Sequence, residues 1–434
     1  MATGISKTRW QGDIDLPPTD ITTEITLSYT GKKTSAEILA MPSAATQLLW
    51  SGTDVNQLYY GDNLAILALL RQNPALRGQV RLIYIDPPFA TKSVFQSRNQ
   101  TDAYHDLRAG AAYIEFLRER LILLKELLAD DGSIYLHLDT NMAFHMKLIM
   151  DEVFGAANFR NWITRKKCNP KNYTRKNYGN VSDFILFYTK SDNYVWHRPY
   201  EAWTENRAEK EYQYVEAETG RLYKKVPIHA PGTRNGETGK EWRGMLPPPG
   251  KHWQYTPARL EEMDARGEIY WSPTGNPRRK VYFDESAGVA IQDIWLEFRD
   301  AHNQNINITG YPTEKNPDML RRIIETSSNE GDWVLDCFAG SGTTLDVAQQ
   351  LKRRWVGIDN STEAIGAILQ RLTTGLAPMG DFINRPEIVS QAQQLAMFAP
   401  TPSPAKNFTV YAAEPYQGQI DSAIQQWLKE QPHA

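Results

Sequence analysis

Apolar positions recur along this chain with two different spacings. Short apolar runs in "VRLIYID", "SIYLHLD" and "SDFILFYTKS" predict buried strands. In "AAYIEFLRERLILLKELLADDG" and "NMAFHMKLIMDEVFG" apolar residues return every three or four positions, which predicts amphipathic helices. Because such strands alternate with helices, we expect an α/β fold whose parallel sheet is covered by helices on both faces.

The same alternation returns in the C-terminal half. "DMLRRIIETSSNEGDWVLDCFAGSGTTLDVAQQLKRRWVGIDNS" predicts a helix, a strand over 333–336, a glycine turn, a helix from Thr343 and a strand that ends at Asp359. Between about 190 and 300 prolines, glycines and aromatics are frequent and helical spacing is weak, which predicts an inserted domain of short strands and loops. We therefore divide the chain into five parts: 1–55, 56–160, 161–310, 311–378 and 379–434, with a strand around 181–189 that belongs to the main sheet.

Composition sets outer limits on the kind of protein. The 434 residues, 41% of them hydrophobic, suffice for a large α/β domain with an insertion, and the net charge is −3. No apolar run approaches the roughly 18 residues of a membrane span, and the start "MATGISKTRW" lacks the apolar core of a signal peptide. Cys168 and Cys337 are too few for a disulfide framework or a four-cysteine zinc site, so we expect a reduced, cytoplasmic protein.

A glycine turn in "DCFAGSGTT" stands where a nucleotide-type cofactor binds, after a strand and at the start of a helix. Gly340 and Gly342 let the backbone approach a ligand, and Asp359 at the next strand end can bind ribose hydroxyls. The chain lacks a Gly-Lys-Ser/Thr motif, which argues against a phosphate-cradling loop. Thr343 and its successors replace the third glycine of the dinucleotide fingerprint, which disfavours NAD and FAD.

This Asp-x-Phe-x-Gly-x-Gly run, with an acid at the next strand end, resembles the S-adenosyl-L-methionine motif of Rossmann-like methyltransferases. That cofactor has no phosphate and carries cationic ammonium and sulfonium groups. The resemblance implies that Asp336 lies near the cationic end. The alternative is a purely structural strand–helix turn.

A second motif, "LIYIDPPFATKSVF", joins an apolar strand to Asp86, two prolines and an aromatic residue. In the same methyltransferases, Asp-Pro-Pro-Phe marks methyl transfer to an exocyclic amino nitrogen. Asp86 and the Pro87 carbonyl would accept the two N–H bonds of that amino group, and Pro87 and Pro88 stiffen the turn. Phe89 would stack on a base taken out of the duplex. The alternatives are a turn acid for Asp86 and core packing for Phe89.

The amino-group motif precedes the cofactor motif, and the insert lies between them. This circularly permuted order resembles the β group of DNA amino-methyltransferases, in particular the modification subunits of type III restriction systems, over roughly residues 56–378. The resemblance implies transfer of a methyl group to adenine N6 in duplex DNA, with 56–160 as the catalytic half and 311–378 as the cofactor-binding half. The cofactor-binding residues that it implies are Asp62, Asn63, Thr313, Lys315, Asp336, Phe338, Ala339, Gly340, Gly342, Thr343, Asp359 and Asn360.

The insert occupies that group's target-recognition position, and its first part, "RKKCNPKNYTRKNYGN", contains no acidic residue. Such a cluster can neutralise phosphates, although a solvated loop is the alternative. The predicted DNA contacts are Lys92, Arg165, Lys166, Lys167, Lys171, Arg175 and Lys176. Because the sequence shows no nuclease or helicase signature, any restriction activity would belong to a separate subunit, and the resemblance also implies a homodimer.

Several other functions would share part of this sequence pattern. Cytosine-N4 transfer uses the same chemistry, but that group more often carries Ser at the position of Asp86. Cytosine-C5 transfer needs a cysteine nucleophile, typically after proline, and neither cysteine follows one. RNA as the substrate, a non-catalytic DNA-binding module on the same fold and a dehydrogenase are the remaining alternatives.

Overall fold

The computed structural model describes residues 25–52, 55–88, 110–170, 176, 178–300, 314–375, 408–420 and 422–430. Two compact units divide the chain. One contains residues 1–197 and 293–434, and the other contains residues 198–292.

The first unit is built on a ten-stranded sheet with the order β1-β18-β2-β17-β16-β3-β4-β6-β5-β15. The six strands from β18 to β4 run parallel, whereas β1 and β6 are antiparallel to their neighbours. The strands are β1 (Thr46–Trp50), β2 (Asn56–Tyr60), β3 (Val80–Ile85), β4 (Leu128–Leu138), β5 (Phe159–Lys166), β6 (Ser182–Thr189), β15 (Ile294–Trp295), β16 (Trp333–Asp336), β17 (Arg354–Asp359) and β18 (Phe408–Ala413).

Strand order in space differs from order along the chain. β16 and β17 come from the C-terminal half, yet they lie between β2 and β3, and Leu335 of β16 pairs with Ile83 of β3. Because β2, β17, β16, β3 and β4 are parallel, their carboxyl ends meet at one edge of the sheet. This topology confirms the predicted α/β class and the permuted order of the two motifs.

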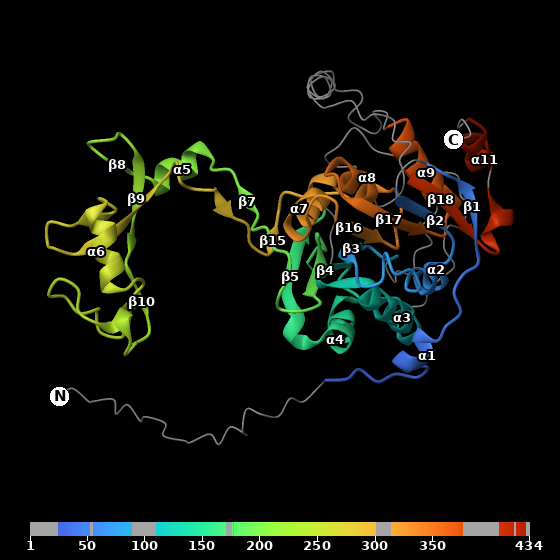
Figure 1. Ribbon diagram of the computed structural model, residues 1–434, viewed down its shortest axis with the longest axis horizontal. Helices are drawn as coiled ribbons and strands as arrows, with labels where there is room; N and C mark the ends of the chain where they lie inside the picture. The colour runs from blue at the N-terminus through green and yellow to red at the C-terminus, as the bar shows by residue number, and fades with distance from the viewer. Residues whose placement is uncertain are drawn as a thin grey trace. The chain divides into compact units, whose positions relative to one another are not determined.

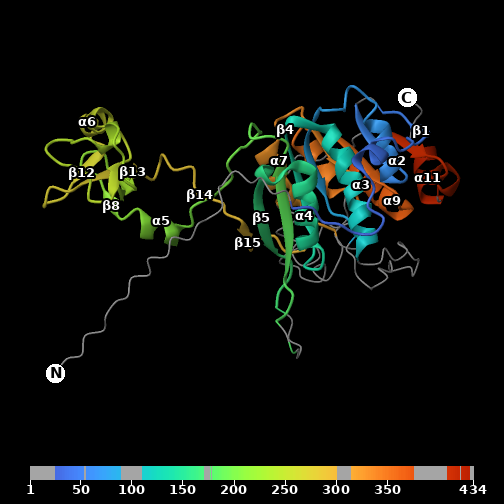
Figure 2. The ribbon, with the colours of Figure 1, turned by 90° about the horizontal axis from the view of Figure 1, so that it is seen from below.

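Helices cover both faces of this sheet. Figure 1 shows α2, α3 and α4 below the strands and α7, α8 and α9 above them, and Figure 2 gives the view from below. The helices are α1 (Ser35–Leu39), α2 (Asn63–Leu70), α3 (Ala111–Leu127), α4 (Ala143–Phe154), η1 (Ala156–Asn158), α7 (Pro317–Ser327), α8 (Thr343–Gln350), α9 (Thr362–Thr373), η4 (Tyr416–Gln419) and α11 (Ser422–Glu430). No helix in these described segments is long and apolar enough to cross a membrane.

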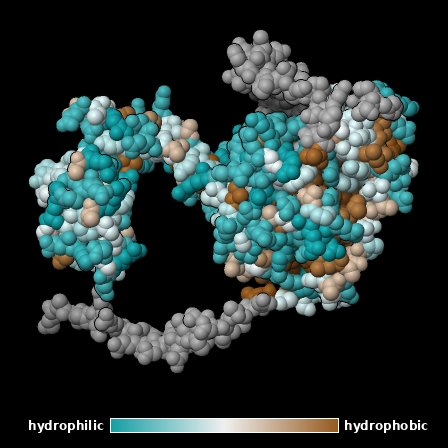
Figure 3. All heavy atoms as spheres, in the orientation of Figure 1, coloured by the Kyte–Doolittle hydropathy of each residue, from teal (hydrophilic) through white to brown (hydrophobic). Residues whose placement is uncertain are grey.

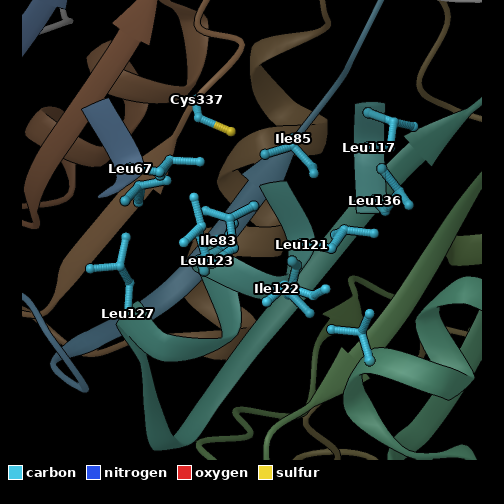
Figure 4. Packing of buried hydrophobic residues seen from close by; sticks show 14 of the residues in the cluster. Leu67, Ile83, Ile85, Leu117, Leu121, Ile122, Leu123, Leu127, Leu136 and Cys337 are labelled. Carbon is cyan, nitrogen blue, oxygen red and sulfur yellow. The ribbon is translucent and has the colours of Figure 1, made fainter. Parts of the chain in front are cut away.

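The core lies between β3 and the helix that follows it. Leu121 and Leu127 of α3 are fully buried and share one cluster with Ile83 and Ile85 of β3, as Figure 4 shows. The spacing of three or four between apolar positions on α3 places them on the face that meets the sheet. The helix ends at Leu127 rather than near Gly132, because the chain enters β4 at Leu128.

Both terminal extensions, for which the sequence predicted no role, take part in this unit. β1 and β18 pair as antiparallel strands at one end of the sheet. The segment before β1 contacts α3 and α4: the Tyr29 hydroxyl donates to Glu115 at 2.5 Å, and Lys32 pairs with Glu152 at 2.6 Å. The described parts of the extensions therefore enlarge the first unit.

The second unit contains a four-stranded antiparallel sheet with the order β12-β13-β9-β8. A separate core joins α6 to this sheet through Leu260, Met263 and Ile269, together with Trp242 and Trp253. Its elements are β7 (Tyr200–Glu201), α5 (Glu205–Glu211), β8 (Tyr214–Val215), β9 (Leu222–Pro227), β10 (His229–Pro231), η2 (Glu237–Gly239), β11 (Lys251–Trp253), α6 (Pro257–Ala265), β12 (Ile269–Trp271), β13 (Pro277–Tyr282) and β14 (Val289–Ala290). The compact unit is shorter than the predicted insert 161–310, because β5, β6 and β15 pair within the ten-stranded sheet.

Candidate active site

Acidic residues follow or end four neighbouring strands at one edge of the sheet. Asp86 comes directly after β3, Asp139 after β4, and Asp336 and Asp359 are the last residues of β16 and β17. β16 pairs with both β3 and β17, so the two sequence motifs, 250 residues apart, meet at adjacent strand ends. The structure thus brings together the predicted amino-group motif and the predicted cofactor motif.

Asp86 has two differently placed carboxylate oxygens. Oδ2 lies 2.7 Å from the Lys315 ammonium nitrogen. Oδ1 lies 3.8 Å from His137 Nδ1, is buried, and has no hydrogen-bond partner among the described residues. A buried oxygen without a partner is costly and often marks a functional position. Pro87 is buried, whereas Phe89 lies outside the described residues.

A buried polar network lies beneath Asp86. His137 Nε2 is 3.0 Å from Asp183 Oδ2, and His137 Nδ1 is 2.8 Å from the Tyr84 hydroxyl. Since a carboxylate only accepts, Nε2 carries the proton, and Nδ1 accepts from Tyr84. Burial lowers the pKa of His137 below 6.5, although the hydrogen bond to Asp183 opposes this shift, so the imidazole is neutral at pH 7.

Asp183 is the charged member of the network. Burial alone would raise the pKa of its carboxyl, but the hydrogen bond from His137 and the charges of Arg165 and Lys167 outweigh burial and hold this pKa below its usual range. Sequence inspection identified "HLD" as a strand end but not the roles of His137 and Asp183. Their partners come from separate strands, which no local pattern reveals.

Arg165 corrects one of the sequence predictions. Its side chain is fully buried, and the guanidinium bonds Asp183 Oδ2 at 3.0 Å, Asp300 Oδ1 at 2.8 Å and the Phe298 carbonyl at 2.7 Å. A guanidinium with these three partners supports the network below Asp86 and is not exposed to a phosphate. This burial contradicts the prediction that Arg165 contacts DNA.

The other predicted DNA contacts are distributed differently. Lys167 lies at the margin of the same network, with its ammonium nitrogen 3.6 Å from Asp183 Oδ1. Lys166 is half-buried and Lys176 is exposed. Lys92, Lys171 and Arg175 lie outside the described residues. A DNA contact by any of these six lysine and arginine residues remains a prediction.

The glycine turn after β16 requires small residues. Gly342 has φ +75°, and a Cβ there would lie 2.8 Å from Ile368 Cγ1, so the left-handed backbone and the close helix both exclude a side chain. Gly340 has φ +52°, and its N–H donates to Asp359 Oδ2 at 2.8 Å. The Ser361 N–H donates to Asp359 Oδ1 at 2.9 Å, so Asp359 closes the turn.

Asp336 is held by residues close to it in sequence. Its Oδ1 accepts from the Phe338 N–H at 3.0 Å, and its Oδ2 accepts from the Thr344 hydroxyl at 2.7 Å. Burial raises the pKa of Asp336 to about 7, against the lowering effect of these two hydrogen bonds. The carboxyl therefore changes charge near neutral pH.

Asp62 and Asn63 lie at the N-terminus of α2. Asp62 accepts from the Leu64 N–H, and its side chain is 48% exposed, so it can also meet a ligand. Asn63 is buried and donates to the Cys337 carbonyl at 2.7 Å, which ties α2 to the end of β16. Arg120 of α3 holds both residues, Asp62 at 3.0 Å and Asn63 at 2.5 Å. Sequence inspection missed Arg120, because its helical spacing resembles that of any charged helix residue.

Lys315 is positioned by a buried ion pair. Its neighbour Glu314 pairs with Arg371 of α9, and Arg371 also donates to the Ser341 carbonyl of the glycine turn at 2.8 Å. This arrangement connects the segment before α7 to the glycine turn, and sequence inspection found neither partner. Thr313 lies outside the described residues.

The remaining predicted cofactor residues line the same turn. Ala339 and Thr343 are buried, Phe338 is half-buried with its ring centroid 6.0 Å from that of Phe116, and Asn360 is exposed. Carboxylates around a glycine-rich turn without phosphate-binding groups suit a cationic nucleoside such as S-adenosyl-L-methionine. Among the described residues, no cluster of three His, Cys, Asp or Glu side chains could hold a metal ion.

The chain is similar in sequence to known DNA methyltransferases. A family model described as DNA methylase matches residues 80–370. A type II methyltransferase of Enterobacter cloacae, M.EcaI, is 47% identical over 379 residues, which cover 85% of this chain and 82% of that protein. The Mod subunit of the type III enzyme StyLTI from Salmonella typhimurium is 27% identical, over 68% of this chain and 50% of that subunit. The solved M1.HpyAVI–SAM complex aligns with 73% of this chain and 98% of its own, at 17% identity and a TM-score of 0.40.

Proposed function

The chain belongs to the N6/N4 DNA methylase family, and we propose that within this family it methylates the N6 amino group of adenine in duplex DNA. It is a DNA methyltransferase, and its cofactor is S-adenosyl-L-methionine. When bound, this cofactor supplies an electrophilic methyl group on a sulfonium. The residues proposed to hold it are those of the glycine turn, together with Asp62, Lys315, Asp336 and Asp359.

The observation that carries the proposal is the state of Asp86. Its Oδ1 is buried without a hydrogen-bond partner among the described residues, at the strand end beside the glycine turn. An amino group that donates to Oδ1 would satisfy this oxygen, while Lys315 holds Oδ2 at 2.7 Å. Oδ1 would thus bind the substrate, whereas Oδ2 binds the protein through Lys315.

We propose a mechanism in which Asp86 orients the nucleophile. The amino nitrogen of adenine is a weak nucleophile, because its lone pair is delocalised into the ring. Oδ1 of Asp86 accepts one N–H and the Pro87 carbonyl accepts the other, which favours a tetrahedral nitrogen whose lone pair points away from the ring. On methylation the nitrogen would lose one proton, which Asp86 would receive, while the bound cofactor would supply the methyl group from its sulfonium.

Adenine is favoured over cytosine by the acidic residue itself. Cytosine-N4 methyltransferases use the same chemistry, but they more often carry Ser at the position of Asp86. The Lys315 contact further fits an acidic residue here, since its ammonium forms an ion pair with Asp86 Oδ2 at 2.7 Å that a serine could not form. Cytosine N4 remains the second candidate.

The deciding experiment identifies the modified base. The full chain is expressed in a host without DNA methylation, its genomic DNA is digested to nucleosides, and the nucleosides are separated by mass spectrometry. We expect N6-methyladenine. N4-methylcytosine as the sole product would overturn the adenine assignment, and the absence of any modified base would contradict the catalytic role of Asp86.

A further inference from the structure

One face of the sheet in the second unit carries tyrosines and basic residues. Directly paired residues in antiparallel strands point to the same side, and sides alternate along a strand. Lys225 of β9 pairs with Lys280 of β13, Arg278 pairs with Tyr270 of β12, and Tyr223 pairs with Tyr214 of β8. We call this side of the sheet the tyrosine face; it consists of Tyr214, Tyr223, Lys225, Tyr270, Arg278, Lys280 and Tyr282. Tyr223 and Tyr282 are buried, Lys225, Tyr270 and Lys280 are half-buried, and Tyr214 and Arg278 are exposed.

The helices of the unit lie on the opposite face of this sheet. Ile269 of β12, which alternates with Tyr270, packs into the cluster that contains Leu260 and Met263 of α6. Lys224, which alternates with Lys225, lies over the ring of Tyr212 at the end of α5. Neither helix therefore covers the tyrosine face, and Tyr214 on this face is 40% exposed.

Charge is distributed unevenly along the tyrosine face. Toward the end of the face that carries Tyr282 and Tyr223, Lys280 pairs with Glu216 at 2.7 Å, and the neighbouring Arg221 pairs with Asp284 at 2.8 Å. Lys225, directly opposite Lys280, and Arg278, two residues before Lys280 toward the Tyr270 end, have no carboxylate within ion-pair distance in the part of the chain that the structure describes. Instead, the Lys225 ammonium lies 3.6 Å and 3.5 Å from the ring centroids of Tyr214 and Tyr270.

The neighbouring ribbon of β10 and β11 extends this positive end. Lys251 is exposed and, like Lys225, has no carboxylate partner among the described residues. β10 begins at His229, two residues after Pro227, the partner of Arg278 in β13, and Lys251 pairs with Pro231 at the end of β10. In the view of Figure 3, hydrophilic residues cover most of the surface of this unit.

We propose that the positive end of the tyrosine face, with Lys225, Arg278 and Lys251, binds the sugar-phosphate backbone of the target DNA duplex. This inference rests on the proposed function and identifies the surface by which the insert holds the substrate. The cations neutralise phosphates, and the hydroxyls of Tyr214 and Tyr270 can donate to phosphate or sugar oxygens. Duplex DNA is the partner favoured by charge, since the uncovered end presents cations without compensating carboxylates.

The test compares two charge-matched double variants of the full chain. Lys225→Ala with Arg278→Ala removes two cations from the tyrosine face, and Lys210→Ala with Arg259→Ala removes two from α5 and α6. Each protein is titrated into a fluorescent 30-base-pair duplex at several salt concentrations, S-adenosylhomocysteine binding is measured in parallel, and thermal unfolding checks the fold. We expect affinity for DNA to fall by at least about tenfold in the first variant, with the salt slope reduced by about 1.8, and to change by less than about twofold in the control.

The outcomes separate this inference from the proposed function. Equal DNA affinity and equal salt slope in the two folded double variants would overturn the tyrosine-face assignment, even if the wild-type chain methylates DNA. Preferential displacement of the duplex by double-stranded RNA would overturn DNA as the partner. Failure of the wild-type chain to methylate any DNA would instead contradict the proposed function, whatever the two variants bind.

Discussion

Asp86 and Asp336 end adjacent parallel strands, yet their surroundings differ. Both oxygens of Asp336 accept hydrogen bonds from residues two and eight positions later, Phe338 and Thr344. Asp86 meets Lys315, more than 200 residues later, and one of its oxygens has no partner among the described residues. Asp336 thus completes its own turn, whereas Asp86 has an oxygen that can accept a hydrogen bond from another molecule.

At one edge of the sheet, Asp336 thus shapes a turn, whereas Asp86 is available to bind another molecule. A carboxyl that is satisfied locally forms the same turn whether or not a ligand is present. A carboxyl that depends on distant groups can be oriented by them. Below Asp86 lies the network in which Asp183 is hydrogen-bonded to His137 and to Arg165. The comparison can be tested on each side by substitution.

Replacement of Asp86 should have the largest effect. We expect Asp86→Ala to lower kcat by about 10³-fold or more, because the amino group loses its acceptor, while the affinity for S-adenosyl-L-methionine changes little. Single-turnover methylation and isothermal titration measure the two quantities. Asp130→Ala, which removes an exposed carboxylate from the start of β4, serves as the control and should keep full activity. Substantial residual activity in Asp86→Ala would contradict the assignment of Asp86, rather than Asp336, as the acid that binds the amino group.

Removal of the buried guanidinium should chiefly affect stability. Arg165→Ala leaves Asp183 charged and buried, so we expect the free energy of unfolding to fall by about 3–5 kcal/mol. Urea denaturation measures this loss, and Lys176→Ala, an exposed cation of the same predicted cluster, should change stability by less than about 0.5 kcal/mol. A stable Arg165→Ala protein that had lost only DNA affinity would restore the original prediction for this residue.

Asp336 should confer pH dependence on cofactor binding. With its pKa near 7, the carboxyl is neutral below and charged above that pH, so the affinity for the cationic cofactor should rise roughly tenfold from pH 6 to pH 8. Asp336→Asn, which has no charge to gain, should flatten this dependence. The ratio of the affinities for S-adenosyl-L-methionine and S-adenosylhomocysteine, measured across this range, isolates the sulfonium. An unchanged pH profile in the Asn variant would show that Asp336 has only its structural task.

The smallest expected effect comes from Tyr84. Tyr84→Phe removes the hydroxyl that donates to His137 Nδ1, which should destabilise the protein by about 1 kcal/mol and lower kcat roughly fivefold. Tyr135→Phe removes a similarly buried hydroxyl, bonded to Ser327, and should cost comparable stability without a change in kcat. Equal activities in the two variants would mean that the network supports the fold but does not orient Asp86.

The sequence predicts helices and strands more reliably than it predicts the contacts that their side chains make. The strands that end at Asp86, Asp336 and Asp359 and the helix from Thr343 were predicted, because apolar runs, glycines and strand-end acids are local signals. The end of α3 was placed too late, since Leu128 and Ala129 suit a helix as well as a strand. The prediction that Arg165 contacts DNA rests on the basic cluster and on the position of the insert, and the buried carboxylate partners of Arg165 cannot be read from its neighbours in the chain.

The sequence by itself determined the α/β class, the permuted motif order and the glycine turn after Asp336, because each depends on residues within one or two elements. Only the tertiary structure decided which oxygen of Asp86 has no partner among the described residues, that Arg165 supports the site from below, and that a face of the inserted sheet is left uncovered by helices. The reason is physical. Hydrogen bonds, ion pairs and burial at these positions join strands that lie tens to hundreds of residues apart, and their distances follow only from the packing of the sheets and helices.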